Sequence, residues 1–393
     1  MKVLHVIPSL SAVHGGPTRA LALMERELLS QGISVETVTT DDDGPGRHNG
    51  KPCGVALEED GATRRYFHKT LDFYKASPSM GRWLARHAHD YDLLHIHAMF
   101  SYSSIAAARA ARRAKVPYVI RPLGTLSPYG VTQRRPWLKQ ASLALLDGPA
   151  LRGAAAVHFT SSAERDEALR LGIPIRPVVI PLGIALPEKG DGSRFLARHP
   201  AAAHGTRLLY LSRLDPKKNV EGLIQALRLL SLRGMTPTLI VAGDGEADYL
   251  RSLKALATAQ GVAGQIIWLG HVSGDAKADA LAAADVYVLP SFSENFGIAV
   301  AEALALGLPC VVGHGVALAA AVGAAGAGIA VGTDGESIAD GLARYIKSES
   351  LRSDAGIAAA ALAARDYSAS SMGRRLVELY SNIMPNTATQ RLE

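Results

Sequence analysis

Short apolar runs rich in β-branched residues alternate along this chain with longer segments that repeat at helical spacing. The run KVLHVIPS at residues 2–9 predicts a buried strand. The next segment, residues 15–32, opens on two glycines, ends at Gly32 and places its apolar side chains on one helical face: Leu21, Met24, Leu28 and Leu29. The beginning of the chain therefore predicts a strand followed by an amphipathic helix.

The same alternation continues through the first half of the chain. Residues 33–40, 91–98 and 116–123 predict three more strands, and residues 101–114 predict the helix between the last two. Repeated strand–helix–strand units favour a parallel sheet that is covered by helices.

A segment rich in glycine, proline and charge, residues 181–193, interrupts this pattern. A second alternation follows, with strands predicted at residues 206–214, 236–245, 265–272, 285–291 and 309–313 and helices at 219–234, 247–260, 275–284 and after Gly297. We therefore predict an α/β protein with two doubly wound domains, residues 1–187 and 188–365. A helix within residues 366–385 is expected to pack back against the first domain, and residues 386–393 are expected to form a flexible tail.

The composition agrees with two domains that have sizeable cores. The 393 residues are 48% hydrophobic and 20% charged, which excludes a chain that is disordered as a whole. Two cysteines, Cys53 and Cys310, predict no disulfide framework and fit a reducing compartment such as the cytoplasm. The first ten residues are apolar over too short a run for a signal peptide, and no apolar run is long enough to predict a membrane span.

The net charge of +6 is distributed unevenly. Residues 1–187 carry 23 Lys and Arg against 16 Asp and Glu, whereas the remainder carries 19 against 20. The basic half is either an arginine-rich solvated surface or one that meets anionic lipid or a phosphate-bearing substrate. Residues 134–146, RRPWLKQASLALL, fit an interfacial helix at the inner face of the cytoplasmic membrane and equally a buried helix with a basic edge. A nucleic-acid partner is not expected, because no aromatic and basic stripe is present.

Ligands of open α/β sheets bind at the carboxyl ends of the strands, so motifs that follow predicted strands carry the most weight. The segment LSRLDPKKN places Arg213 at a strand end and Lys218 five residues later. A departing diphosphate needs positive charge nearby, and a Lys/Arg pair can supply it without a metal. The same residues also fit a solvated basic turn that caps a helix at Asn219.

Two glycine-containing loops follow other strands. VAGDGE, with Gly243, matches neither a dinucleotide fingerprint nor a P-loop, so it either lets a ligand approach the backbone or is an ordinary turn. HGGPTRA offers Gly15 and Gly16, whose backbone N–H groups either hold a substrate oxygen or form a turn without a ligand.

The stretch SFSENFGIAVAEALALG brackets an apolar run with two carboxylates, Glu294 and Glu302. Gly297 begins a predicted helix whose first N–H groups suit a phosphate or sugar oxygen. Carboxylates bind vicinal hydroxyls well, because each can accept from both. The alternative is that Glu294 is a helix-cap acid and Glu302 a solvated helix residue.

In their order and spacing, these motifs resemble those of the retaining glycosyltransferases of family 4 (group 1), and the resemblance covers nearly the whole chain. Its most specific elements are E-x7-E, Glu294 to Glu302, and R-x4-K, Arg213 to Lys218. The GG loop, the GDGE turn and the GHV segment before a short helix agree in order. The resemblance implies a GT-B fold, in which two Rossmann-like domains face a cleft and close over the donor.

The resemblance also implies a role for each matching position. Glu294 would hold hydroxyls of the donor sugar, Glu302 the ribose hydroxyls, and the pair Arg213 and Lys218 the diphosphate, so that no metal is required. Further donor-binding positions would be Gly16, Gly243, His271, Val272, Phe296, Gly297 and Ile298. Positions on the acceptor or donor-sugar side would be Gly15, His97, Arg121 and Gly124.

Three features depart from the family pattern. Leu123 precedes Gly124 where many members have a histidine, whose role Arg121 or the backbone would take over. Ser212 stands where a glycine often precedes the arginine. The stretch RPLGTLSPYG is similar to that of a subset acting on polysaccharide or lipid-linked intermediates.

Two groups of residues raise the question of a metal. His5, His95 and His97 suggest a metal, and His95 and His97 lie on one face of a predicted strand, but no third ligand with suitable spacing is evident, so core or cleft histidines are favoured. Asp41–Asp43 lie in a Gly/Pro-rich loop, for which a solvated acidic turn is favoured.

The function predicted from this resemblance is transfer of a hexose, with mannose favoured, from a GDP- or UDP-linked sugar with retention. The acceptor would be a saccharide or a lipid-linked saccharide in polysaccharide or glycolipid synthesis, and no cofactor is expected. The alternatives are a nucleotide-sugar isomerase of similar shape and a non-catalytic sugar-nucleotide-binding protein.

Overall fold

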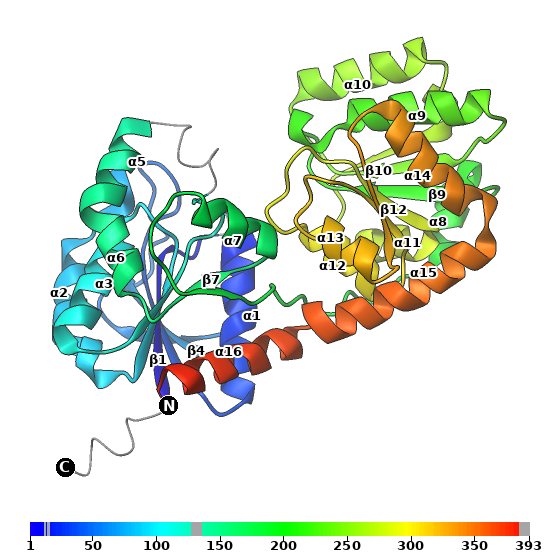
Figure 1. Ribbon diagram of the computed structural model, residues 1–393. Helices are drawn as coiled ribbons and strands as arrows, with labels where there is room; N and C mark the ends of the chain where they lie inside the picture. Colours follow the sequence, from blue (N-terminus) through cyan, green and yellow to red (C-terminus); the bar gives the residue numbers. More distant parts are fainter. Residues whose placement is uncertain (12, 14–15, 127–135, 385–393) are drawn as a thin grey trace. The chain divides into compact units, whose positions relative to one another are not determined.

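The computed structural model describes residues 1–384 apart from residues 12, 14–15 and 127–135 (Figure 1). The described chain divides into two compact units. Unit 1 contains Met1–Gly183 and the C-terminal segment that begins at Ala369, and unit 2 contains Ile184–Ser368. The predicted tail at residues 386–393 lies outside the described residues.

Unit 1 is built on an eight-stranded sheet in the order β3-β4-β2-β1-β5-β6-β7-β8. Its strands are β1 (Lys2–Ser9), β2 (Ser34–Thr40), β3 (Ala56–Glu59), β4 (Ala62–Phe67), β5 (Leu93–His97), β6 (Tyr118–Arg121), β7 (Ala156–Phe159) and β8 (Pro177–Val179). All neighbouring strands are parallel except β3 and β4. The carboxyl ends of the parallel strands therefore lie along one edge of the sheet.

Helices cover both faces of the unit 1 sheet. One face packs against α1 (Gly16–Ser30) and α16 (Ala369–Ile383), which contact each other although they lie at opposite ends of the sequence (Figure 1). The other packs against α2 (Pro78–His87), α3 (Tyr102–Ala114) and α6 (Gly148–Gly153). Among the described residues, unit 1 also contains α5 (Pro136–Ser142) and α7 (Ser162–Leu169).

The helical spacing read in the sequence produces the buried stripe between α1 and the sheet. Leu21, Met24 and Leu28 are fully buried, and they join Val3 and Leu93 of the strands in one core. Each side chain of this size contributes about 1.5–3 kcal/mol on burial, so the stripe fixes how α1 lies on the sheet. The returning helix α16 adds its own apolar side chains: Met372, Leu376, Leu379 and Tyr380.

Unit 2 contains a six-stranded sheet in the order β11-β10-β9-β12-β13-β14, with all neighbours parallel. Its strands are β9 (Arg207–Leu211), β10 (Thr238–Ala242), β11 (Ile266–Gly270), β12 (Val286–Leu289), β13 (Cys310–Gly313) and β14 (Gly328–Val331). Its α-helices are α8 (Gly192–Arg198), α9 (Val220–Leu232), α10 (Ala247–Ala259), α11 (Gly274–Ala283), α12 (Ile298–Ala305), α13 (Ala319–Ala324), α14 (Gly335–Lys347) and α15 (Glu349–Leu362).

The predicted α/β class with two parallel sheets is confirmed, with one local difference. Strand β3 is antiparallel to β4 and forms the exposed edge of the unit 1 sheet. The turn residues Asp60 and Gly61 have φ of 53° and 78°, which suits the two central positions of a type I′ hairpin turn. An Asp-Gly pair between short polar strands was the sequence signal for this hairpin, which the apolar pattern alone does not reveal.

No helix within the described residues is long and apolar enough to cross a membrane.

Candidate functional site

The candidate donor-site residues of unit 2 follow adjacent strands at the carboxyl edge of its sheet. In sheet order, His271 follows β11, Gly243 follows β10, Arg213 and Lys218 follow β9, and Glu294 follows β12. Because all these strands are parallel, their loops emerge at the same edge. The fold thus brings together motifs that are far apart in the sequence.

Lys218 and Glu294 meet directly. Lys218 ends a short 3₁₀ turn, Pro216–Lys218, and its Nζ donates to Oε2 of Glu294. The two side chains are 12% and 23% exposed, so the pair lies in a partly closed position rather than in open solvent. Arg213 is exposed at the end of β9. Lys218 and Glu294 therefore form a pair. The alternatives considered from the sequence, a solvated lysine and a helix-cap glutamate, do not describe them.

Asn219 holds the lysine turn against the neighbouring strands. Its Nδ2 donates to the carbonyl oxygens of Pro290 at 3.2 Å and Thr333 at 2.7 Å. Its Oδ1 accepts from the N–H of Gly222 and caps α9. The backbone of Asn219 has φ 59°, a left-handed conformation that asparagine tolerates better than most residues. The sequence suggested the cap but not the two bonds that position Lys218.

The backbone of Glu294 is braced on both sides. Its N–H donates to the carbonyl of Gly315 at 2.9 Å, and its carbonyl accepts from the N–H of Ala317 at 3.0 Å. These bonds tie the loop after β12 to the segment after β13, so the carboxylate projects from a fixed backbone.

Gly297 forms the N-cap of α12 with φ 93° and ψ 64°. Residues other than glycine rarely adopt this backbone conformation, and a Cβ here would lie 3.2 Å from Cγ2 of Val300. Just before it, Phe296 is buried edge-to-face against Tyr367. The first N–H groups of the helix, from Ile298 onward, lack carbonyl partners within the helix and suit an anionic or hydroxyl oxygen.

Glu302 has a partner that the sequence did not reveal. Nζ of Lys277, on α11, lies 2.7 Å from both carboxylate oxygens. The side chains are 30% and 18% exposed, so Glu302 is neither fully solvated nor fully buried. Lys277 lies six residues after His271 in the GHV segment. The spacing of residues within that segment does not predict that Lys277 contacts Glu302 on another helix.

The glycine loop after β10 is packed against the arginine loop after β9. A Cβ at Gly243 would lie 1.8 Å from the carbonyl oxygen of Ser212, so no side chain fits there. Leu214 also donates its N–H to Asp244 O at 2.8 Å. The close approach at Gly243 is therefore made to the neighbouring backbone. On the far side of this loop, His271 is exposed and Val272 is half-buried.

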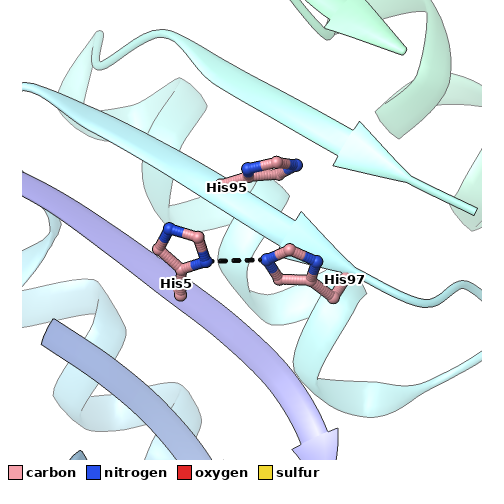
Figure 2. A group of neighbouring side chains, drawn as sticks. All are labelled: His5, His95 and His97. Carbon is pink, nitrogen blue, oxygen red and sulfur yellow. Dashed lines mark hydrogen bonds between the residues drawn. The ribbon is translucent and has the colours of Figure 1, made fainter. Parts of the chain in front are cut away.

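In unit 1, polar residues of neighbouring strands form a buried row on the face covered by α1 and α16. His5 of β1 pairs in register with His95 of β5 (Figure 2). His97, the last residue of β5, pairs with Arg121, the last residue of β6. His158 of β7 extends the row, and all five side chains are at most 2% exposed. The statement that no third ligand accompanies His95 and His97 is wrong, because β1 brings His5 within reach of both.

The histidines of this row share a chain of hydrogen bonds. Nδ1 of His5 lies 2.8 Å from Nε2 of His97, as the dashed line in Figure 2 shows. The hydroxyl of Tyr380, on α16, bonds to Nδ1 of His95 at 2.7 Å, and Nε2 of His158 donates to the carbonyl of Ile180 at 2.9 Å. Nε2 of His5 and Nδ1 of His97 have no partner among the described residues.

Burial determines the charge of this row. It lowers the pKa of His5 and of His158 to about 3, with Arg121 adding to the effect, and it lowers the pKa values of His95 and His97 well below the usual range. Burial also lowers the pKa of Arg121 to about 10. Within the described residues no carboxylate forms an ion pair with this guanidinium, and its Nε has no partner. The row is thus neutral apart from the Arg121 cation, which the charge of Glu164 favours but which forms no direct ion pair within the described residues.

The loop after β6 is tied to α7. The N–H of Gly124 donates to Oε1 of Glu164 at 2.6 Å, and Oε2 of the same carboxylate accepts from Thr160. Leu123, at the position of the family histidine, has φ 60°, which is uncommon for leucine. Gly16 begins α1, and Gly15 lies outside the described residues.

The prediction of a solvated acidic turn at Asp41–Asp43 is wrong for its first two residues, which are buried. Asp42 accepts from Nζ of Lys69 at 2.7 Å and also pairs with Lys75. Burial alone would raise the pKa of Asp41, but hydrogen bonds from the Lys69 N–H, His48 and His68 lower it.

The sequence matches two family models that together span most of the chain. Glycosyl transferase 4-like domain matches residues 15–183, and Glycosyl transferases group 1 matches residues 195–361. The fold and the order of the motifs define the class as a group 1 glycosyltransferase. The chain belongs to this family.

Among curated proteins, the chain is 37% identical over 121 residues to O-antigen chain mannosyltransferase B of Escherichia coli, covering 30% of this chain and 31% of that protein. It is 31% identical over 210 residues to phosphatidyl-myo-inositol mannosyltransferase of Mycobacterium leprae, covering 52% and 54%. These matches span about a third and about half of the relatives' lengths.

Solved structures confirm the GT-B fold. Anabaena HepE in complex with UDP and glucose has a TM-score of 0.74 and 21% identity, covering 97% of this chain and 100% of that one. Sucrose-phosphate synthase from Thermosynechococcus elongatus has a TM-score of 0.75 and 17% identity, covering 98% and 100%. At these identities the likeness establishes the fold alone.

Proposed function

We propose that this protein transfers a hexose from a nucleotide diphosphate sugar to a saccharide or lipid-linked saccharide acceptor, with retention of configuration and without a metal. Mannose carried by GDP is the first choice, because several relatives are named as mannosyltransferases. A UDP-linked sugar is the second, because the related HepE structure contains UDP.

One observation carries this proposal: Lys218 and Glu294, identified from separate motifs, meet at the carboxyl edge of the unit 2 sheet. A cation and a hydroxyl-binding carboxylate side by side suit a donor whose sugar and diphosphate are adjacent groups. The N-terminus of α12, which begins one residue after Gly297, adds backbone N–H groups next to the same carboxylate.

The proposed chemistry relies on charge rather than on a covalent nucleophile. When the donor binds, Lys218 exchanges its contact with Glu294 for the phosphate, which frees the carboxylate to accept hydrogen bonds from the sugar. The glycosidic bond to the diphosphate then breaks while the acceptor hydroxyl attacks from the same face, and the departing phosphate oxygen takes the proton of that hydroxyl. Lys218 and Arg213 stabilise the negative charge that develops on the departing diphosphate.

The nucleotide would lie between the end of β11 and α12. Glu302 would accept hydrogen bonds from the ribose hydroxyls, and His271 and Val272 would border the base. Lys277 contacts Glu302 and would have to share or release this carboxylate when the ribose binds.

The acceptor side is assigned to unit 1. Gly16, His97, Arg121 and Gly124 all belong to segments that follow or end strands of its sheet. Arg121 supplies the charge at this edge, in place of the histidine that Leu123 replaces. A buried cation without a direct ion pair among the described residues favours an acceptor that carries a negative charge, such as the phosphate of a lipid-linked saccharide.

Peripheral contact with an anionic membrane at the cytoplasmic face is a further part of the proposal. Residues 134–135 of the predicted interfacial segment lie outside the described residues, but Trp137 and Leu145 are 70% and 75% exposed. Exposed aromatic and aliphatic side chains next to Lys139 suit an interface with anionic lipid. Flotation with anionic vesicles tests this, and W137A/L145A should bind more weakly. Equal binding by both proteins would contradict it.

The function is tested by incubating the protein with radiolabelled GDP-mannose, UDP-glucose and other nucleotide sugars, with and without lipid-linked acceptors. A transferase forms product only with acceptor, an isomerase converts the donor alone, and a binding protein does neither. Thermal unfolding with GDP, UDP and ADP identifies the nucleotide, because a ligand of the folded state raises the melting temperature. Product formation should persist after treatment with a chelator.

A further inference from the structure

A second group of histidines lies at the same carboxyl edge of the unit 1 sheet, after β2 and β4. Asp41 follows β2, His68 follows β4, and His48 and Cys53 lie in the loop that connects β2 to β3. We name these four residues the loop cluster. None of them has a place in the proposed transfer reaction.

The side chains of the loop cluster converge on the Asp41 carboxylate. Nδ1 of His48 lies 2.9 Å from Oδ1, and Nδ1 of His68 lies 2.9 Å from Oδ2. Sγ of Cys53 lies 3.9 Å from Oδ2. The two imidazole rings stack with centroids 4.7 Å apart, so both histidines present the same edge to the carboxylate.

The backbone holds this arrangement in place. The N–H of Asp41 donates to the carbonyl of Phe67 at 2.9 Å, and the carbonyl of Asp41 accepts from Asn49 at 2.8 Å. Cys53 forms a parallel bridge with Tyr66. Three separate segments are therefore fixed around one carboxylate.

These separations are close to those of ligands around one tetrahedral metal ion. Bond lengths of about 2.0–2.2 Å to nitrogen and oxygen and about 2.3 Å to sulfur place N and O ligands about 3.3 Å apart and O and S ligands about 3.5 Å apart. The observed N–O separations of 2.9 Å and the O–S separation of 3.9 Å bracket these values. The donor atoms of Asp41, His48 and His68 already lie within 4.8 Å of one another, whereas Sγ of Cys53 lies outside this group and would reach the same ion by rotation of its exposed side chain.

We propose that the loop cluster binds a zinc ion through Nδ1 of His48, Nδ1 of His68, a carboxylate oxygen of Asp41 and the thiolate of Cys53. Two nitrogen ligands, one oxygen and one sulfur suit Zn²⁺, whereas Mg²⁺ and Ca²⁺ prefer oxygen ligands. Such an ion has a structural role, because it would fasten the loop after β2 to the end of β4.

Charge distinguishes the loop cluster from the buried histidine row. The carboxylate of Asp41 and the thiolate of Cys53 together neutralise a divalent cation. His5, His95 and His97 offer only neutral ligands beside the cation of Arg121, so a metal there would leave several positive charges buried without a counter-ion. Of these two groups, the loop cluster is the one that suits a metal.

Proton balance and access also agree with binding. In the metal-free protein each histidine Nδ1–H can donate to Asp41, and metal binding moves that proton to Nε2. The side chains of His48 and His68 are 37% and 59% exposed, and Cys53 is exposed, so the ion can enter from solvent. The thiol releases one proton to solvent as it becomes the thiolate ligand.

The test is titration of the metal-free full-length protein with Co²⁺ under reducing conditions, followed by displacement with Zn²⁺. Wild type should bind one Co²⁺ with the visible absorption of a tetrahedral site and a thiolate-to-cobalt charge-transfer band. C53S should lose the charge-transfer band and weaken binding by at least about 10-fold, since even outer-shell changes cost 10–100-fold. H48Q/H68Q should lose binding at this site.

H87Q is the matched control, because His87 also lies 2.9 Å from a carboxylate, that of Asp90, and is similarly exposed. It should bind Co²⁺ as wild type does. Zn²⁺ should raise the melting temperature of wild type and H87Q but not of C53S, while all metal-free variants should unfold like metal-free wild type. An octahedral spectrum without the thiolate band, or equal affinity in C53S and wild type, would overturn the proposal.

Discussion

The charged side chains at the carboxyl edges of the two sheets lie in contrasting environments. In unit 2 two of the charged groups are lysine–carboxylate pairs: Lys218 contacts Glu294, and Lys277 contacts Glu302, all at partly exposed positions. In unit 1 the polar row is sealed from solvent, its histidines are neutral, and Arg121 has no ion-pair partner within the described residues.

This difference teaches what a ligand must do at each edge. In the proposed function, a ligand of unit 2 would exchange existing ion pairs for contacts with itself, which costs little because partly exposed pairs are weak. A ligand of unit 1 that carries a negative charge would add a direct ion pair to Arg121 and offset part of the cost of burying that cation.

Lowering the pH is the perturbation expected to produce the largest difference between the two edges, measured as a loss of stability. Folded-state pKa values of about 3 for His5 and His158 lie below the unfolded value of 6.5, so the unfolded chain binds more protons between these limits. The contribution of these neutral histidines to the stability of the fold is therefore present above pH 6.5 and is lost as the pH falls. From pH 7 to 5 the loss is about 2 kcal/mol per histidine.

Urea unfolding of a W268F variant measures this loss, because the two remaining tryptophans, Trp83 and Trp137, belong to unit 1. H158Q should lose less stability than its parent over the same pH range. Equal stability of unit 1 at pH 7 and pH 5 would contradict the neutral buried row.

Removing the lysine of the unit 2 pair should lower activity rather than stability. K218A should reduce transfer about 10²–10³-fold, the usual effect of deleting a group that stabilises transition-state charge. The partly exposed Glu294 that remains can be solvated, so the melting temperature should change little. Steady-state transfer rates measure the effect.

K217A is the matched control for K218A, because Lys217 is the neighbouring exposed lysine of the same turn. It should retain most of the activity, and K218R should retain more than K218A. Near-normal turnover by K218A would remove Lys218 from the mechanism.

The sequence was sufficient to predict the two parallel sheets and the residues at the edge of unit 2. Strand and helix periodicity located most of the sheet strands. In the structure Glu294 lies in a loop and Glu302 in the helix that follows it, as their spacing predicted. Local spacing does not encode which distant side chain each charge meets. The partners Lys277 for Glu302 and Tyr380 for His95 follow from sheet order and from the return of α16, and neither follows from a motif.

The histidine row illustrates the same limit. His5, His95 and His97 were all considered as metal ligands from the sequence, but only the alternation of His95 and His97 indicated that two of them are close. His5 lies in another strand and becomes their neighbour through the parallel register of β1 and β5. Likewise, the buried environment of Asp41 depends on lysines and histidines from other segments.

The buried cation of unit 1, Arg121, gives a prediction with opposite effects on stability and activity. R121M should stabilise unit 1, because the shift in the pKa of Arg121 from 12.5 to about 10 corresponds to a cost of about 3 kcal/mol. The same variant should lower transfer to a charged acceptor, by about 10-fold or more for the loss of one charge-assisted hydrogen bond.

Urea unfolding and transfer assays of R121M measure the two effects, and R113M, at an exposed arginine of α3, is the control for loss of one positive charge. A destabilised R121M that keeps full activity would show that the cation has a structural partner and would remove the contrast between the two edges.

The smallest expected effect is a difference in nucleotide affinity between variants of the two residues of the second ion pair in unit 2, Glu302 and Lys277. E302Q should weaken binding of the nucleotide about 10-fold, or about 1.4 kcal/mol, because it loses a carboxylate that accepts from the ribose hydroxyls. K277M should change the affinity less or increase it, because Lys277 competes with the ribose for the same oxygens, each 2.7 Å from its Nζ. Calorimetric titration with GDP and UDP measures both affinities, and K277M/E302Q should resemble E302Q. Equal losses in the two single variants would mean that Lys277 positions Glu302 for the donor, and the pair would then be a fixed part of the site rather than one that the ligand exchanges.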